Sequence, residues 1–187
     1  MNLIKTTSIL SLSVILALQS PILTFAASNS NNLSKNQTAA ISQNCASIKQ
    51  SLKHLQHADV RTRIFFGSTY QSILTNFMTP LNLRLVKDNQ PNPELVQTQT
   101  DFSSSRNNFT QNYINYSKKL EKLLAIDCRF RPQDFYKQLN STRQSRAKLA
   151  RSAQKTQTIL ENHLKIVEAM QAKKTKPTPP KKEQTNV

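Results

Sequence analysis

Between Asn92 and Cys128 the chain carries apolar side chains every seven residues, and from Phe109 onward their steps alternate between four and three. This heptad spacing keeps one stripe of a helix turned toward its partner helices. Asn92 can cap the first turn of such a helix, and Pro93 suits its first position. These features predict one long helix in the middle of a bundle. Its expected buried seam is Leu95, Phe102, Phe109, Tyr113, Tyr116, Leu120 and Leu123.

The chain contains a single glycine, Gly67, in 187 residues. Folds built from strands and tight turns need glycine wherever φ is positive, so their architecture is disfavoured. Glycine-rich phosphate loops and nucleotide-binding fingerprints are excluded for the same reason. The apolar content of 37% suits helices that share narrow seams. We therefore expect an all-α fold, an elongated bundle of three or four helices with coiled-coil-like seams.

Two further helical stretches precede this middle helix. The first is expected to begin near Ala39, with the seam Ile41, Cys45, Ile48, Leu52 and Leu55. Around residues 57–59 the seam changes phase, which indicates either a stutter in one long helix or a break capped by Asp59. Pro80 is expected to kink the second stretch, because its ring removes one backbone hydrogen bond. Residues 88–93 are predicted to form a loop.

The last helix is expected to open at Pro132. Its seam keeps steps of four and three throughout, but Arg146 and His163 fall on it, which indicates a long and partly solvated helix. One chain covers such a seam incompletely, and this favours self-association. The full seam is Phe135, Leu139, Thr142, Arg146, Leu149, Ala153, Thr156, Leu160, His163, Val167 and Met170.

The N-terminus has the pattern of a secretory signal peptide. Lys5 precedes an apolar run, and small residues stand at Thr24 and Ala26, where a cleavage site needs them. Cleavage would give a soluble exported protein, extracellular, periplasmic or at the cell surface; an uncleaved membrane anchor is the alternative. The expected organisation is a signal peptide over 1–26, a flexible polar leader over 27–38, a helical domain over 39–172 and a disordered Lys/Pro-rich tail over 173–187.

Export changes the meaning of the two cysteines. Cys45 and Cys128 both lie in the expected mature chain, and two cysteines in an oxidising compartment pair, with two free thiols as the alternative. If residues 60–87 and 95–125 run antiparallel, helical rise leaves Cys45 roughly 15–20 Å from the end of the later helix. We expect an extended connection after Ile126 to close this distance. The expected disulfide would also agree with this geometry if the first helix folded over the bundle. If there is no bridge at all, the distance needs no explanation.

The formal charge of +16 indicates anionic partners such as wall polymer, anionic lipid or nucleic acid. Aromatic residues are not interleaved with the basic ones, so base stacking is not indicated. A merely solvated basic surface is the alternative interpretation. The candidate polyanion-binding residues are Arg143, Arg146, Lys148, Arg151 and Lys155 on the last helix and Lys173, Lys174, Lys176, Lys181 and Lys182 in the tail.

Catalytic and metal-binding patterns are weak. His54 and His57 share one helix face and Asp59 follows, but a structural zinc site needs four ligands and His163 is the only other histidine. A Cys–His nucleophile pair would require a free thiol at Cys128. The acidic residues form no convincing close pair. We therefore expect no enzymatic activity, no metal and no cofactor.

Several short runs resemble a known but uncharacterised family. They are Asp59-Val60-Arg61-Thr62-Arg63 with Gly67 after it, Tyr70-Gln71-Ser72-Ile73-Leu74, Pro80-Leu81-Asn82-Leu83-Arg84-Leu85, and Asp127-Cys128 with Phe135-Tyr136 shortly after. Together they resemble small exported helical proteins of ultrasmall, host-attached bacteria. The resemblance covers most of the mature chain and implies a signal peptide, helices and a cysteine pair. It supplies no catalytic or ligand-binding residue.

Three functions remain in view. The first is a non-enzymatic envelope or extracellular protein that binds through its helix surfaces or assembles with copies of itself. The second is a polyanion-binding protein that uses the basic last helix and tail. The third is a holdase chaperone whose basic helical arms enclose unfolded exported proteins.

Overall fold

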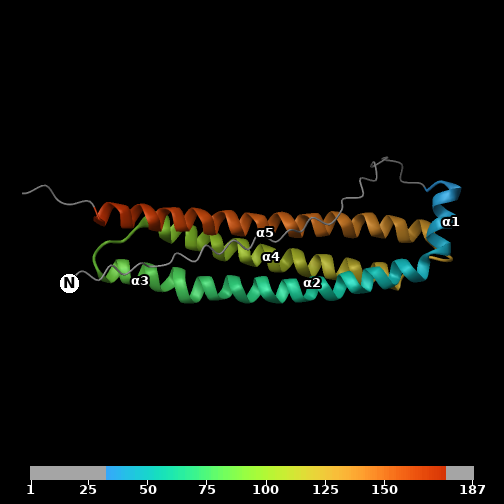
Figure 1. Cartoon of the computed structure of the whole chain (residues 1–187), viewed down its shortest axis with the longest axis horizontal. Coiled ribbons are helices and arrows are strands. Elements are labelled where there is room, and N and C mark those ends of the chain that lie inside the picture. The colour runs from blue at the N-terminus through green and yellow to red at the C-terminus, as the bar shows by residue number, and fades with distance from the viewer. Residues whose placement is uncertain (1–32, 176–187) are drawn as a thin grey trace, which may run out of the picture. The chain divides into compact units, whose positions relative to one another are not determined.

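The computed structural model describes residues 33–175, which belong to the compact unit Asn31–Val187. Every regular element in this described range is helical, and the all-α bundle expected from the sequence is confirmed. The α2–η1–α3 segment runs in one direction, α4 returns beside it, and α5 reverses again (Figure 1). The predicted signal peptide lies outside the described residues. The elements are α1 Lys35–Gln43, α2 Cys45–Ile73, the π-helix η1 Leu74–Met78, α3 Thr79–Lys87, α4 Pro93–Ala125 and α5 Pro132–Thr175.

Helix α4 packs against both α2 and α5 along one buried stripe. All of its predicted seam residues are buried, and the structure adds Ser105 to them. The helix begins as expected, because the side-chain oxygen of Asn92 accepts a hydrogen bond from the backbone N–H of Leu95 at 3.1 Å. Such a cap satisfies one of the donors that the first turn leaves unpaired.

Two clusters of buried side chains divide the core along the bundle. The cysteine-end cluster is Cys45, Tyr116, Leu120, Leu123, Cys128 and Phe135. The loop-end cluster is Tyr70, Met78, Phe102 and Phe109. In the latter, the ring of Tyr70 meets Phe102 and Phe109 edge to face at 5.8 and 5.7 Å. Each such pair contributes about 0.5–1.5 kcal/mol beyond its buried area, so the aromatic rings fix the approach of α2 to α4.

The change of seam phase near residue 58 is not a break. Helix α2 is continuous from Cys45 to Ile73, so Asp59 lies inside it and does not cap a new helix. The disturbance expected at Pro80 takes the form of the π turn η1, which directly precedes α3. A π turn is wider than an α turn, and it accommodates a ring that would otherwise collide with the preceding carbonyl groups.

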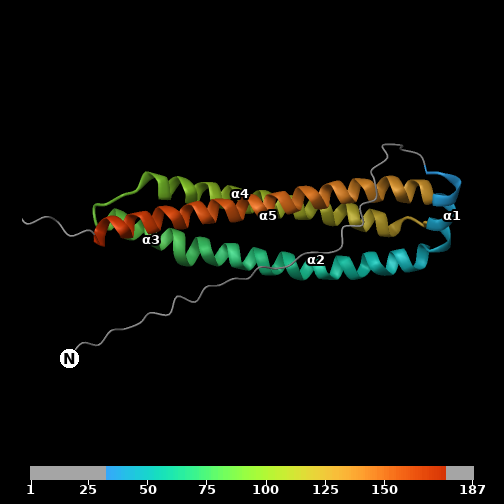
Figure 2. The same ribbon diagram turned by 45° about the horizontal axis from the view of Figure 1, so that its top comes forward.

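The first helix differs from the prediction at both of its ends. It begins at Lys35, four residues before Ala39, because Ser34 and Gln37 form a capping box in which each side chain accepts from the other's backbone N–H. It ends at Gln43, and Asn44 separates it from α2. Figures 1 and 2 show α1 lying across one end of the bundle, beside the first turns of α2 and α5.

Cys45 and Cys128 form the expected pair, with Cα atoms 5.5 Å apart. The backbone leaves the helical conformation at Ile126, where ψ is 131°, and this extended connection carries Cys128 to the first turn of α2. The thiols are therefore not free, and although α1 crosses the end of the bundle, Cys45 belongs to α2 and is reached through the extended connection. The pair joins the start of α2 to the segment between α4 and α5.

Helix α5 opens at Pro132 as predicted and continues to Thr175, beyond the predicted tail boundary at Lys173. The expectation of a partly solvated seam is wrong at His163, which has no exposed surface, whereas Arg146 is half exposed. Polar pairs fill much of the seam with α4: the hydroxyls of Ser105 and Thr156 lie 2.8 Å apart. Residues 176–187 of the predicted disordered tail lie outside the described residues.

Candidate functional site

Four of the five basic residues predicted on the last helix form no ion pair with another described residue. Arg143, Lys148, Arg151 and Lys155 all have exposed side chains. Arg146 differs from them, because its guanidinium forms an ion pair with Asp59 of α2 at 3.0 Å. An arginine that is already bound by a carboxylate has less charge to offer a polyanion. We therefore assign Arg146 to the bundle itself and leave it out of the candidate site.

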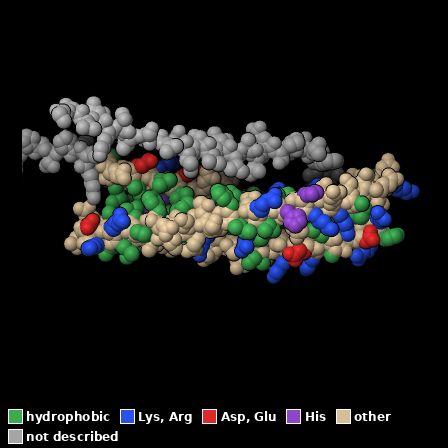
Figure 3. Space-filling view, turned by 60° about the horizontal axis from the view of Figure 1, so that its bottom comes forward, with side chains coloured by type: hydrophobic (Ala, Val, Ile, Leu, Met, Phe, Trp, Pro, Cys, Tyr) green, Lys and Arg blue, Asp and Glu red, His purple; other side chains and the backbone are tan. Residues whose placement is uncertain are grey.

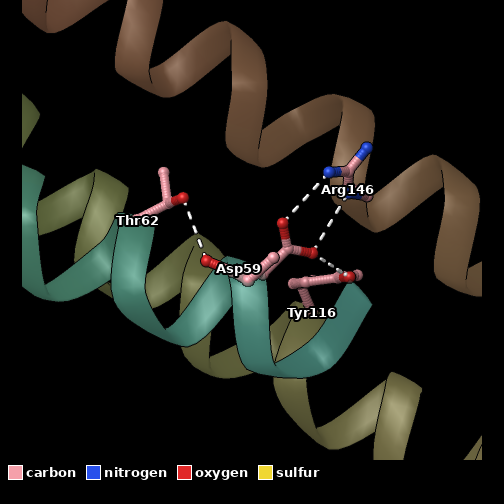
Figure 4. Close-up of polar contacts among 5 residues, drawn as sticks. Asp59, Thr62, Tyr116 and Arg146 are labelled. Carbon is pink, nitrogen blue, oxygen red and sulfur yellow. Dashed lines mark hydrogen bonds and ion pairs between the residues drawn. The ribbon is translucent and has the colours of Figure 1, made fainter. Parts of the chain in front are cut away.

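Asp59 joins three helices through its side chain. Its carboxylate accepts hydrogen bonds from the Tyr116 hydroxyl of α4 at 2.5 Å and from Arg146 Nε and Nη2 of α5 at 3.2 and 3.0 Å. Figure 4 shows the carboxylate between these two donors. Such charge-assisted bonds are stronger than neutral ones. This is the only ion pair among the residues that the structure describes, and it holds α2 against α4 and α5.

The contacts at Asp59 alter the acidity of both partners. Burial, together with the hydrogen bond to Asp59, raises the pKa of the Tyr116 hydroxyl above its ordinary value of 10.0. The hydrogen bond to Asp59 raises the pKa of Arg146. Both shifts keep the two donors protonated, so this cluster holds its hydrogen bonds at neutral pH and has no proton to exchange there.

A groove between α4 and α5 gathers lysines from both helices. Its volume is about 360 Å³, and we call it the lysine groove. Among the described residues no carboxylate lines it. Lys118, Lys122 and Lys148 have exposed side chains, and Lys119 is half-buried. The groove is lined by Asn112, Asn115, Lys118, Lys119, Lys122, Ser145 and Lys148.

The chemistry of the lysine groove suits an anion with several charges. Each lysine ammonium is a compact point charge with three N–H donors, and the Asn112 and Asn115 amides add neutral donors beside them. Phosphate, sulfate and carboxylate oxygens accept from exactly such groups. The donors of this groove are therefore suited to binding such an anion.

Sequence reasoning identified only one of the four lysines of this groove, Lys148. The lysines that it missed, Lys118, Lys119 and Lys122, lie in the last turns of α4. Their signal was present in the spacing, because residues three and four apart share a helix face. Antiparallel packing then brings them to α5: the Thr142 hydroxyl donates to the backbone carbonyl of Lys119 at 3.2 Å.

The predicted tail lysines lie at the end of α5 or outside the described residues. The backbone of Lys173 and Lys174 belongs to α5, while Lys176, Lys181 and Lys182 lie outside the described residues. Their part in polyanion binding stays a prediction.

His163 lies apart from the other two histidines. His54 and His57 are exposed on α2, and the Asp59 carboxylate beside them is occupied by Tyr116 and Arg146. His163 is buried on α5, where its Nδ1 lies 2.7 Å from the Thr98 hydroxyl. Burial lowers its pKa from 6.5. Within residues 33–175 no three His, Cys, Asp or Glu side chains gather as a metal site would require.

No protein-family model, curated protein or solved structure matches this chain. Within the described range, none of the helices has the combination of length and apolar character that crossing a bilayer requires.

Proposed function

We propose that this protein is an exported, non-enzymatic helical protein that binds a polyanion along the seam between α4 and α5. The lysine groove carries the proposal, because it places four ammonium groups from two helices around one hollow without a carboxylate among the described lining residues. Like charges held together in this way repel one another, and an anion between them relieves the repulsion.

Exposed lysines of α5 continue on both sides of the lysine groove, which favours a polymer over a single small anion as the ligand. Lys137 and Lys155 lie eleven residues before and seven residues after Lys148, spacings that return to nearly the same side of a helix. Both are exposed. At a rise of about 1.5 Å per residue the three span roughly 27 Å. A chain of phosphates or sulfates could contact this whole row, whereas one ion would occupy only part of it.

The experiment compares two proteins of equal net charge. In the groove variant, Lys118, Lys119, Lys122 and Lys148 are all changed to Gln. In the control variant, Lys35, Lys53, Lys87 and Lys165, which are exposed on other parts of the helices, are changed to Gln. The ligands are a labelled single-stranded oligonucleotide and long-chain polyphosphate, titrated by fluorescence anisotropy at several salt concentrations.

The groove variant should bind both polymers much more weakly than the control variant does. Each lost phosphate contact lowers the slope of log K against log[salt] by about 0.7, so the slope should fall by about 3. Equal losses in the two variants would mean that net charge alone attracts the polymer, and the proposed site would be wrong. Removal of residues 173–187 measures the separate contribution of the tail.

Export is the second part of the proposal. It is supported by the signal-peptide pattern over residues 1–26 and by the paired cysteines, which persist in oxidising compartments. Mass spectrometry of the intact native protein tests it. We expect a chain that begins at Ala27 or Ser28 and gains two hydrogens on reduction. An uncleaved chain with two free thiols would contradict both export and the pair.

A further inference from the structure

A second groove, between α2 and α4, lies apart from the lysine groove and has a different chemistry. Its volume is about 480 Å³. Arg63, Ile64 and Gly67 line it from α2, and Arg106 and Phe109 line it from α4. We call it the arginine groove. It combines two guanidinium groups with apolar side chains and bare backbone, whereas the lysine groove is lined only by Asn, Ser and Lys residues.

The glycine in this groove is not explained by the fold. Gly67 lies in the interior of α2, where glycine lowers helix stability relative to alanine. Its φ is not positive, so the backbone does not require glycine. A Cβ built on it would meet no atom within 4 Å, so internal packing does not require glycine either. What Gly67 does provide is a length of helix without a side chain, over which another backbone can approach closely.

The apolar side chains around Gly67 are left uncovered. Ile64 is 58% exposed and Val60, one turn earlier on the same side of α2, is 39% exposed. Figure 3 views the bundle from the α2 side and shows hydrophobic side chains standing between Lys and Arg side chains on this face. Apolar surface with a charged rim is the usual composition of a protein–protein contact.

The positive charge of the arginine groove favours a negatively charged partner. The Arg63 guanidinium lies 5.2 Å from the centre of the Tyr113 ring, and the Arg106 guanidinium donates to the side-chain oxygens of Gln71 and Asn107. These neutral groups hold both arginines in place without neutralising them. Among the described residues that line the groove, none is acidic. A second copy of this chain, with its formal charge of +16, is therefore disfavoured, and a partner with carboxylates is favoured.

We propose that the arginine groove is a docking site for an acidic amphipathic helix of another protein. Carboxylates of that helix would accept hydrogen bonds from Arg63 and Arg106, and its apolar stripe would pack over Gly67 and Ile64. Helices that dock in grooves present apolar residues at i, i+3, i+4 and i+7, with charged residues beside them. The inference does not rest on polyanion binding, which uses the opposite flank of α4.

The test uses a synthetic helix-forming peptide with leucine at these spacings and glutamate on both sides of the stripe. Its control peptide carries glutamine in place of every glutamate. Gly67→Leu should weaken binding of the acidic peptide by about tenfold or more, because a leucine at this position points back along the helix over the groove. Gly67→Ala adds only a methyl group to open space and should change the affinity by less than about threefold. Circular dichroism verifies that both variants are as helical as the original protein.

The role of the two arginines is tested with charge-removing variants. Arg63→Gln combined with Arg106→Gln should abolish the preference for glutamate over glutamine in the peptide, while the four lysine-to-glutamine changes in the lysine groove should leave that preference intact. Amide chemical-shift changes should map to residues 63–71 and 106–110. Three results would overturn the proposal: equal affinity of the two peptides, peptide binding that Gly67→Leu leaves unchanged, or self-association of the protein that Gly67→Leu removes. The last would make a second copy the occupant.

Discussion

At the cysteine end of the bundle, the Cys45–Cys128 pair and the Asp59 carboxylate connect α2 to the other two long helices. At the opposite end, where α3 turns into α4, the buried groups are less well matched. His163 Nε2 and Asn82 Oδ1 are buried there without a hydrogen-bond partner in the described part of the chain. The same end contains a cavity of about 190 Å³, lined mainly by Leu81, Leu85, Leu95, Val167 and Met170.

We therefore expect the loop end of the bundle to be less stable than the cysteine end. A buried polar atom without a partner costs about 1–3 kcal/mol, and apolar side chains that line a partly open hollow make fewer contacts than they would in a filled core. The loop end also exposes Leu83 and Val86 on α3. Local opening begins where buried contacts are fewest, so we expect the loop end to open before the cysteine end.

The largest expected effect concerns the cysteine pair. The pair closes a loop with a sequence separation of 83 residues, for which the chain-entropy relation gives about 4.5 kcal/mol of stabilisation. Replacing both Cys45 and Cys128 by alanine should lower the free energy of unfolding by roughly this amount. Urea denaturation followed by circular dichroism measures it.

Reduction of the original protein provides the control for this prediction, because it opens the same loop without changing a residue. The reductant should have no effect on the double alanine variant. If reduction left the free energy of unfolding of the original protein unchanged, the cysteine end would owe its stability to packing alone, and the contrast between the two ends would largely disappear.

The next effect concerns the carboxylate that joins three helices. Asp59→Asn keeps the size of the side chain but removes its charge, so the bonds from Tyr116 and Arg146 lose their charge-assisted character. We expect the free energy of unfolding to fall by about 2–3 kcal/mol. Glu168→Gln, which removes an exposed carboxylate from α5, should stay within about 0.5 kcal/mol of the original protein.

A double-mutant cycle locates the origin of the Asp59 effect. If Asp59 acts through Arg146, the change Arg146→Gln should cost much less in the Asp59→Asn background than in the original protein. Equal costs in the two backgrounds would mean that the ion pair contributes nothing measurable, as is common for exposed pairs.

Acid should weaken the loop end first. Burial lowers the pKa of His163 in the folded protein, whereas the unfolded chain has the ordinary value near 6.5. As the pH falls below 6.5 the unfolded chain takes up the proton first. The stabilisation is therefore complete above pH 6.5 and is lost as the pH falls toward the lowered pKa. At pH 5.5 the loss is at most about 1.4 kcal/mol.

Urea denaturation between pH 7.5 and 5.5 measures this loss. In His163→Gln the corresponding pH dependence should be absent, because no group at position 163 then titrates. His57→Gln changes an exposed histidine of α2 and should retain the dependence. An unchanged slope in His163→Gln would assign the pH dependence to another group and would remove one reason for calling the loop end weaker.

The sequence predicted correctly the features that depend on a single helix. The seam of α4, its Asn92 cap, the opening of α5 at Pro132 and the loop before Pro93 all follow from residue spacing and capping chemistry. The first helix was predicted too short at its start, because the capping box at Ser34 went unrecognised within a polar stretch. Ser, Asn and Gln are common in flexible segments, and their composition concealed a specific pattern.

The candidate site was less accessible to prediction, because it depends on how helices meet. The sequence places Arg146 on the seam of the last helix, but it does not show that this side chain reaches Asp59, which lies 87 residues earlier. The lysine groove likewise needs the register of α4 against α5, which neither helix specifies alone. The seam of the last helix was expected to be partly solvated because the polar residues Arg146 and His163 fall on it. Burial of His163 beside Thr98 reverses that expectation.

The smallest expected change in the free energy of unfolding concerns Gly67. Gly67→Ala should raise the free energy of unfolding by about 1 kcal/mol, because alanine favours the helix and its Cβ meets no neighbour. The reverse change at an exposed position inside α5, Ala150→Gly, should lower it by a similar amount. Gly67 stands between Phe66 and Tyr70, which pack in the loop-end cluster, and its helix α2 continues to Cys45 in the cysteine-end cluster. Amide hydrogen exchange of Gly67→Ala should therefore slow equally at the slowest-exchanging amides of both clusters. If exchange slowed only at amides of the loop-end cluster, the two ends of the bundle would unfold separately, and Gly67 would belong to the unit that unfolds at the loop end.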